Sequence, residues 1–98
     1  MSFGLEFLRE AAAELECVVG DYEAHTAGLG VRFRHVIEGV CGGVVERPFL
    51  WRERLGGYRR VNLPRFPYYI AFVIREDLVL VVAVAHASRR PDYWKRRL

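Results

Sequence analysis

Apolar side chains recur at helical spacing in the first half of the chain. One group falls at positions i, i+3, i+4 and i+7 and predicts a helix over about residues 9–25: Leu15, Val18, Val19 and Tyr22. After a break at residues 26–30 the same spacing returns and predicts a second helix that ends before Pro48. Its apolar positions are Phe33, Val36, Ile37, Val40, Cys41 and Val44. Two helices joined by about five residues are expected to fold back as an antiparallel hairpin.

The second half of the chain contains runs of β-branched and aromatic residues, which predict strands. These runs cover residues 58–63, 69–74 and 78–86, and a shorter run at residues 5–8 predicts an opening strand. The last two runs are separated by Arg75, Glu76 and Asp77, which is typical of an antiparallel hairpin.

The run that begins at Leu78 predicts the centre of the sheet. Residues 78–85 are all apolar, so this strand is expected to be covered on both faces, by the helical hairpin on one side and partly by the C-terminal tail on the other. Residues 47–57 show no clear period and predict a loop, whereas Pro91 can begin a short last helix over residues 91–98. The order of elements predicts an α+β fold in one domain, residues 1–98.

The apolar runs are too short for a membrane-spanning segment. The longest has eight residues, whereas a spanning helix needs about 20, and residues 1–10 do not resemble a secretion signal. We therefore expect a cytoplasmic protein with no membrane partner. Cys17 and Cys41 have no metal-ligand spacing and are expected to be buried free thiols in the two helices. No metal or other cofactor is predicted.

The formal net charge of +3 conceals an asymmetry between the two halves. Up to Glu46 there are three arginines and eight acidic residues, a net charge of −5, whereas from Arg47 onward twelve basic residues face four acidic ones, a net charge of +8. All the basic residues except Lys95 are arginines, whose planar guanidinium suits bidentate contact with phosphate or carboxylate. A GC-rich genome also favours arginine over lysine, but it does not explain the clustering.

Motifs in the second half resemble the RelE/ParE toxin superfamily. They are Phe66-Pro67-Tyr68, then Ala83-Val84-Ala85-His86, then Arg89-Arg90-Pro91-Asp92-Tyr93-Trp94. Upstream, residues 11–22, the Gly28-Leu29-Gly30 turn and Pro48 resemble the helical hairpin of the same family. The resemblance covers nearly the whole chain, and its motifs follow the order of the predicted elements.

This resemblance implies a helical hairpin packed on a twisted antiparallel sheet of three to four strands, and a toxin neutralised by a cognate antitoxin. It also implies two alternative activities, since RelE-like members cleave messenger RNA on the ribosome and ParE-like members inhibit DNA gyrase. The long helical hairpin and the C-terminal residues Pro91, Tyr93 and Trp94 resemble ParE-like members more than RelE-like members. A decayed toxin that only binds antitoxin is a third reading, and the sequence leaves the oligomeric state open.

Under the ribonuclease reading, three residues are candidates for catalysis. His86 is the one histidine of the basic half and would be the base or acid, with Tyr93 as a second partner and Arg90 stabilising the phosphate. Candidate residues for binding a nucleic acid or another target are Arg59, Arg60, Arg65, Arg89 and Arg90. The lysines that some ribonuclease members use have no counterpart on these strands, which favours the gyrase reading.

Structural roles stay open for the same residues. His86 can instead be interpreted as a strand-end histidine hydrogen-bonded to the last helix. Tyr93 and Trp94 can be interpreted as anchors that dock a short tail. Arg59 and Arg60 alternate across a strand, so one is expected to face solvent and the other to contact the helical hairpin or the antitoxin.

Overall fold

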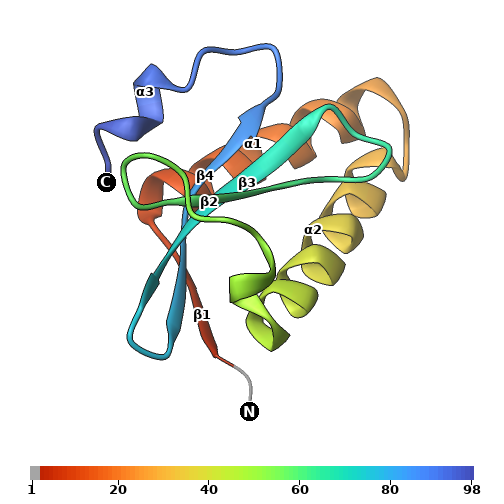
Figure 1. Ribbon diagram of the computed structural model, residues 1–98. Helices are drawn as coiled ribbons and strands as arrows, with labels where there is room; N and C mark the ends of the chain where they lie inside the picture. Colours follow the sequence, from red (N-terminus) through yellow and green to blue (C-terminus); the bar gives the residue numbers. More distant parts are fainter. Residues whose placement is uncertain (1–2) are drawn as a thin grey trace.

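A helical hairpin lies on one face of a four-stranded sheet, and the C-terminal segment lies on the other face (Figure 1). The computed structural model describes residues 3–98. The strand order is β1-β4-β3-β2, so β1 and β2 are the edge strands. Along the chain the elements are β1 (Gly4–Phe7), α1 (Arg9–His25), α2 (Leu29–Glu46), the 3₁₀ turn η1 (Pro48–Leu50), β2 (Arg59–Asn62), β3 (Tyr68–Arg75), β4 (Leu78–His86) and α3 (Asp92–Lys95).

The predicted α+β architecture is confirmed, with one parallel strand pair that the sequence pattern did not indicate. Strands β3 and β4 form the predicted antiparallel hairpin, and β2 pairs antiparallel with β3. The opening strand β1 is present and runs parallel to β4, with Gly4 opposite Leu78. The sheet is therefore mixed.

Residues 1 and 2 of the predicted domain lie outside the part of the chain that the structure describes. Within residues 3–98, no helix is long and apolar enough to cross a membrane.

Glu23 organises the turn between α1 and α2. Its carboxylate accepts hydrogen bonds from the backbone N–H groups of Gly28 (2.7 Å) and Gly30 (2.9 Å), and these bonds, the one from Gly28 first, lower the pKa of Glu23. Gly28 has a φ of 86°, which favours glycine. A Cβ on Gly30 would lie 2.4 Å from the carbonyl oxygen of Val19, so glycine also permits the close approach of the helices. The link is shorter than predicted, since α2 already begins at Leu29.

Strands β3 and β4 separate two apolar clusters, as expected for strands covered on both faces. The cluster on the helical side includes Phe33, Ile37, Cys41, Ile70, Phe72, Val79 and Val81. The cluster on the tail side combines three alanines with three large aromatic residues: Ala71, Ala83, Ala85, Tyr58, Tyr69 and Trp94. The β3–β4 pairing shifts register between Ala71 and Phe72, which leaves Val82 as an extra residue in β4.

Trp94 anchors the C-terminal segment on the sheet. Its side chain is 1% exposed, and its Nε1–H donates a hydrogen bond to the hydroxyl of Tyr69 (2.9 Å). The ring of Tyr58 meets it edge to face, with 4.9 Å between ring centroids. Trp94 is therefore buried and hydrogen-bonded, as predicted for a residue that anchors the tail. A helix this short needs such a contact to stay docked.

A second anchor, here called the Glu14–Arg97 clasp, joins α1, β4 and the tail. The guanidinium of Arg97 donates to both carboxylate oxygens of Glu14 (2.9 and 3.1 Å) and to the carbonyl of Val82 (2.9 Å). The Glu14 carboxylate also accepts the N–H of Val84 (3.0 Å). Both side chains of the pair are largely buried, and the hydrogen bond that Arg97 donates to Glu14 is the main cause of a raised pKa of Arg97. The clasp therefore provides hydrogen-bond partners for the backbone carbonyl of Val82 and the backbone N–H of Val84, the residues on either side of Ala83 in β4.

The last helix is shorter than the predicted span of residues 91–98. It covers Asp92–Lys95. Beyond it, the N–H of Arg97 donates a hydrogen bond to the carbonyl of Trp94, and the N–H of Leu98 donates one to the carbonyl of Lys95. The helix ends where Arg97 turns toward the clasp, because its contacts with Glu14 and β4 outweigh the small gain from one more helical turn.

The prediction that both cysteines are buried is confirmed for Cys41 and wrong for Cys17. Cys41 lies on the inner face of α2, and burial raises the pKa of its thiol to about 11. In α1 the apolar stripe turns Leu15 and Val18 inward, which leaves Cys17 on the exposed side near Asp21. A cysteine beside a helical stripe is not necessarily part of it.

We predict that Glu14→Ala destabilises the fold by about 1–3 kcal/mol, because it leaves the Val84 N–H and the Arg97 guanidinium without their buried partner. Glu16→Ala, on the same helix, removes an exposed pair with Arg34 and is expected to cost clearly less, because solvent screens that pair. Urea denaturation measures both variants. Equal midpoints for the two would show that the clasp contributes nothing beyond a surface ion pair.

We also predict different reactivities for the two thiols. At pH 8 a disulfide reagent such as DTNB should modify Cys17 within the folded protein and Cys41 only after denaturant is added, because the reactive species is the thiolate and burial disfavours it. Cys17→Ser and Cys41→Ser assign the two phases. Rapid modification of Cys41 in the native protein would contradict the burial of α2 against the sheet.

Candidate functional site

Three of the predicted site residues, His86, Arg89 and Tyr93, line one cleft at the end of β4. We call it the C-terminal cleft; it has a volume of about 290 Å³ and lies between α1, the end of β4 and the turn that leads to α3. Its other lining residues are Glu14, Cys17, Val18, Asp21, Tyr68 and Val84. The sequence therefore identified part of a real cavity, but not the acidic wall that α1 contributes to it.

His86 is engaged in a local turn. Its Nδ1 accepts a hydrogen bond from the backbone N–H of Ser88 (3.1 Å), and the hydroxyl of Ser88 lies within hydrogen-bond distance of the same nitrogen (2.8 Å). The ring of His86 meets that of Tyr68 edge to face, with 4.9 Å between ring centroids. The proposed structural alternative of a bond to the last helix is wrong, because the partner lies in the preceding turn. Because Nδ1 accepts from Ser88, this nitrogen is not free to take a proton from a substrate.

Tyr93 faces the same cleft but carries a firmly held proton. Burial, and then the nearby charge of Glu14, raise the pKa of its hydroxyl. The guanidinium of Arg89 lies over its ring at 3.8 Å from the centroid, and that of Arg97 at 5.6 Å. Tyr93 is therefore suited to donating a hydrogen bond, and Arg89 is partly committed to a cation–π contact.

The charges around the cleft do not suit a phosphodiester. The α1 side contributes the carboxylates Glu14 and Asp21, and among the residues that line the cleft Arg89 is the one arginine facing them. The charge of Glu14 is already paired with Arg97, so a nucleic acid backbone placed beside His86 would be repelled mainly by the carboxylate of Asp21. Among residues 3–98 no group of three His, Cys, Asp or Glu side chains is placed to hold a metal ion.

The remaining predicted arginines lie elsewhere. Arg59 is on the helical side of β2, where it donates to the carbonyl of Trp51 (2.6 Å) and covers the ring of Phe49 at 5.1 Å. Arg60 is on the opposite face, stacked 3.7 Å over the ring of Tyr69. The predicted alternation of Arg59 and Arg60 is confirmed, but the expectation that one of them faces solvent is wrong, because both guanidinium groups make packing contacts.

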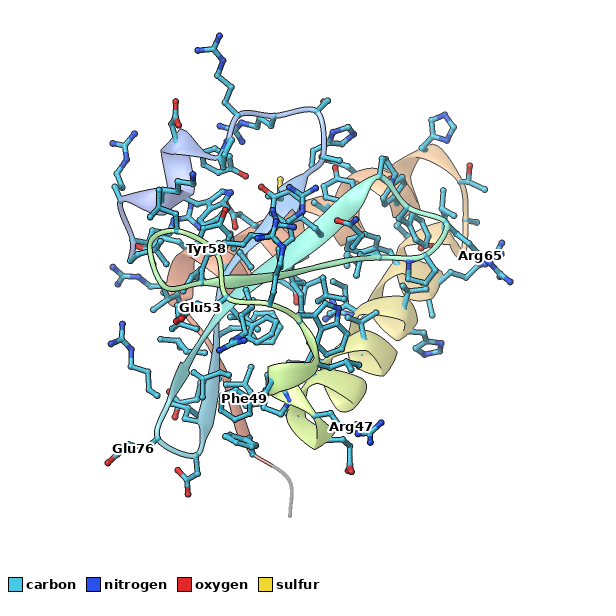
Figure 2. The ribbon with its side chains drawn as sticks, viewed as in Figure 1. Arg47, Phe49, Glu53, Tyr58, Arg65 and Glu76 are labelled. Atoms are coloured by element: carbon cyan, nitrogen blue, oxygen red, sulfur yellow. The ribbon has the colours of Figure 1, made fainter. Side chains whose placement is uncertain are left out.

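Arg65 and Arg90 are exposed and lie in loops. Arg65 occupies the β2–β3 turn with a φ of 68°, which is uncommon outside glycine, and Figure 2 shows it pointing away from the molecule. Arg90 lies in the segment between β4 and α3. The five predicted binding arginines are thus divided between two faces of the sheet and two loops, and Arg89 is the one that lines the C-terminal cleft together with His86 and Tyr93.

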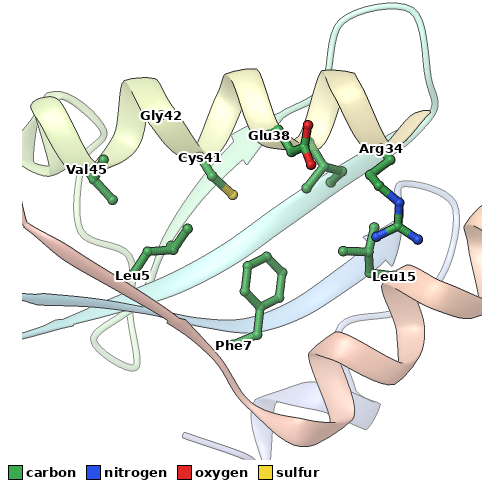
Figure 3. Close-up of a pocket in the computed structure, with 9 residues that line it drawn as sticks. Leu5, Phe7, Leu15, Arg34, Glu38, Cys41, Gly42 and Val45 are labelled. Atoms are coloured by element: carbon green, nitrogen blue, oxygen red, sulfur yellow. The ribbon is translucent and has the colours of Figure 1, made fainter. Parts of the chain in front are cut away.

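A larger and more apolar cavity, which we call the β1 groove, lies between β1 and α2 (Figure 3). Its volume is about 370 Å³, and its lining consists of Leu5, Phe7, Leu15, Arg34, Ile37, Glu38, Cys41, Gly42 and Val45. Sequence reasoning missed this groove. The available signal was the short apolar strand at residues 5–8, whose side chains the helical hairpin does not fully cover.

The backbone of β1 adds hydrogen-bonding capacity to this groove. The amides of Gly4 and Leu8 donate to carbonyls near β4, at 2.8 and 2.9 Å. Because the backbone groups of a strand point alternately to its two sides, those of Leu5 and Phe7 face the open edge of the sheet. An extended segment could therefore pair with β1 while placing an apolar side chain in the groove.

A family model and solved structures match this chain. The family model described as ParE toxin of type II toxin-antitoxin system, parDE, matches residues 5–91. A solved structure described as "Chromosomal ParDE TA system from P. aeruginosa" superposes with a TM-score of 0.75 and 17% identity, covering 89% of this chain and 98% of that chain. No curated protein sequence matches. At this identity the structural likeness shows the fold alone, whereas the family match extends from β1 through β4 to Pro91, and on this basis the chain belongs to the ParE toxin family of type II toxin–antitoxin systems.

Proposed function

We propose that this toxin arrests bacterial growth by binding and inhibiting DNA gyrase, without cleaving RNA, and that a cognate antitoxin keeps it inactive. The proposal rests on membership of the ParE family and, above all, on the hydrogen bond that Nδ1 of His86 accepts. Its Nδ1 is occupied by Ser88, and carboxylates of α1 line the same cleft. A general base must have a free lone pair within reach of the substrate proton.

The chemistry of the other candidates also favours binding over catalysis. Tyr93 is held in its protonated form, and Arg59 and Arg60 make packing contacts on opposite faces of the sheet. Catalysis of RNA cleavage needs a base, an acid and fixed positive charge within one site. Inhibition by association needs only a complementary surface.

A ribosome-dependent ribonuclease is the second candidate. The observation in its favour is that His86, Arg89 and Tyr93 line a single cleft. This arrangement combines a titratable ring, a cation and a hydroxyl, so it is tested directly in the experiment below.

The β1 groove is the proposed seat of the antitoxin. An extended antitoxin segment would add to the open edge of β1 through backbone hydrogen bonds and bury an apolar side chain among Leu5, Phe7 and Val45. The net charge of +8 on the C-terminal half would attract acidic residues elsewhere in the same partner and speed its association. A segment that is disordered when free can cover both regions.

We predict that induction of the unmodified protein lowers plasmid supercoiling and produces no new messenger RNA ends. His86→Ala should preserve toxicity and cost about 1–2 kcal/mol in stability, because its loss removes packing and a turn contact and no catalytic group. Supercoiling gels and mapping of RNA 5′ ends measure the two activities. RNA ends at defined codon positions that disappear in His86→Ala at an unchanged melting temperature would establish the ribonuclease reading instead.

We further predict that Leu5→Ser weakens the complex with the antitoxin by about 10-fold or more, because Leu5 is 42% exposed at the rim of the groove and would become buried on binding. Toxicity in the absence of antitoxin should be unchanged. The matched control is Val31→Ser on α2, which replaces an apolar residue of similar exposure outside the groove. Equal affinity of both variants for the antitoxin, measured by calorimetry, would place the antitoxin elsewhere.

A further inference from the structure

Leu55 is an apolar side chain presented to solvent by an ordered turn. It is 97% exposed, the highest value among the exposed large apolar residues of the described chain. The turn is closed by hydrogen bonds from the amide of Arg54 to the carbonyl of Tyr58 (2.7 Å) and from the amide of Gly57 to the carbonyl of Arg54 (2.9 Å). Gly56 and Gly57 have φ values of 102° and 83°, which this tight geometry requires.

The turn packs against the C-terminal segment. A Cβ on Gly56 would lie 3.5 Å from Cδ1 of Leu98, which is itself 37% exposed. Behind the turn, Tyr58 contacts Trp94, and the ammonium group of Lys95 lies 5.7 Å from the centroid of the Tyr58 ring. Figure 1 shows the loop before β2 passing beside the C-terminus, and Figure 2 places Tyr58 at this junction. Turn and tail therefore form one surface.

Exposed cationic side chains lie in the two segments that form this surface, which we call the turn–tail surface. They are Arg52, Lys95 and Arg96, and the exposed acidic residues of segments 52–57 and 92–98 are Glu53 and Asp92. A leucine projecting from a positively charged surface is complementary to an apolar pocket with an acidic rim. Such pockets, with an apolar floor and a polar rim, are typical of protein surfaces that receive an anchor side chain, which favours a protein as the partner.

We propose that the turn–tail surface is where the toxin docks on its protein target, with Leu55 buried in an apolar pocket and Arg52, Lys95 and Arg96 facing acidic residues of the target. This inference rests on the proposed function in that the toxin acts by binding a protein. It adds the surface and the anchor residue. The elements involved, the loop before β2 and α3, are different from those of the β1 groove, so target and antitoxin would contact different sets of residues.

Preorganisation makes Leu55 an effective anchor. Its turn is already closed by backbone hydrogen bonds, so binding does not have to order the loop, and most of the side-chain area becomes available for burial in the complex. Full burial of a leucine corresponds to about a 10- to 100-fold gain in affinity. The cations around it would act mainly on the rate of association.

Leu55→Ser tests the proposal, with Val31→Ser as the control that removes an exposed apolar side chain elsewhere. Both variants should keep the melting temperature of the unmodified protein, since Leu55 is almost fully exposed in the free protein. We expect Leu55→Ser to raise the toxin level needed for half-maximal growth arrest by about 10- to 100-fold and to weaken binding to purified gyrase by the same factor. Val31→Ser should change neither, and both variants should keep their affinity for the antitoxin.

Full growth arrest by Leu55→Ser would overturn the proposal. So would binding of the unmodified protein to phosphatidylglycerol vesicles that Leu55→Ser abolishes, because the partner of the surface would then be a membrane. Growth arrest is measured without reference to the target. If the unmodified protein arrests growth but leaves gyrase active, the gyrase proposal fails, and a loss of arrest in Leu55→Ser still supports a docking role for the surface.

The charged rim has its own test. Arg96→Gln should slow association with purified gyrase at low ionic strength by a few-fold and reduce the salt dependence of that rate, whereas Arg32→Gln, an exposed arginine of α2, should not. Equal effects of the two substitutions would show that the toxin responds to its net charge alone and would overturn the placement of the rim.

Discussion

The Glu14–Arg97 clasp supplies hydrogen bonds where β4 loses its partner strand. Pairing with β1 ends at Phe7, and the N–H of Leu8 makes the last bond, to the carbonyl of Val81. Beyond that point the backbone groups of Val82 and Val84 would lie unpaired beneath α1, at a cost of about 1–3 kcal/mol each. The clasp satisfies both with side chains from residues 83 positions apart. The tail, the C-terminal cleft and the turn–tail surface depend on this contact for their position.

The sequence predicted the elements whose signal is local and failed where the signal is a long-range contact. Helical spacing gave the hairpin, and the apolar run from Leu78 gave the central strand with both faces covered. The parallel pairing of β1 with β4 and the clasp depend on contacts that no periodicity encodes. Of the predicted catalytic residues, His86 and Tyr93 line one cleft with Arg89, whereas Arg90 does not line it, and the carboxylates that α1 contributes to the cleft could be located only in the packed structure.

Three surfaces of the toxin differ in chemistry, and this difference separates their roles. The β1 groove combines an apolar lining with an open strand edge, which suits a segment that adds to the sheet. The C-terminal cleft mixes carboxylates with Arg89, so its charges partly cancel. The turn–tail surface presents Leu55 among exposed cations, which suits a folded partner with a pocket.

The arginine content of the C-terminal half overstates its capacity for binding phosphate. Arg59 and Arg60 pack on aromatic rings on opposite faces of the sheet, and Arg89 lies over Tyr93. Arg97 is bound in the clasp. A guanidinium committed to a ring or a carboxylate would have to give up that contact to bind a phosphate, which subtracts from any gain in affinity. A net charge of +8 is therefore compatible with a protein target, because much of the charge stabilises the fold and the exposed remainder acts at long range on association.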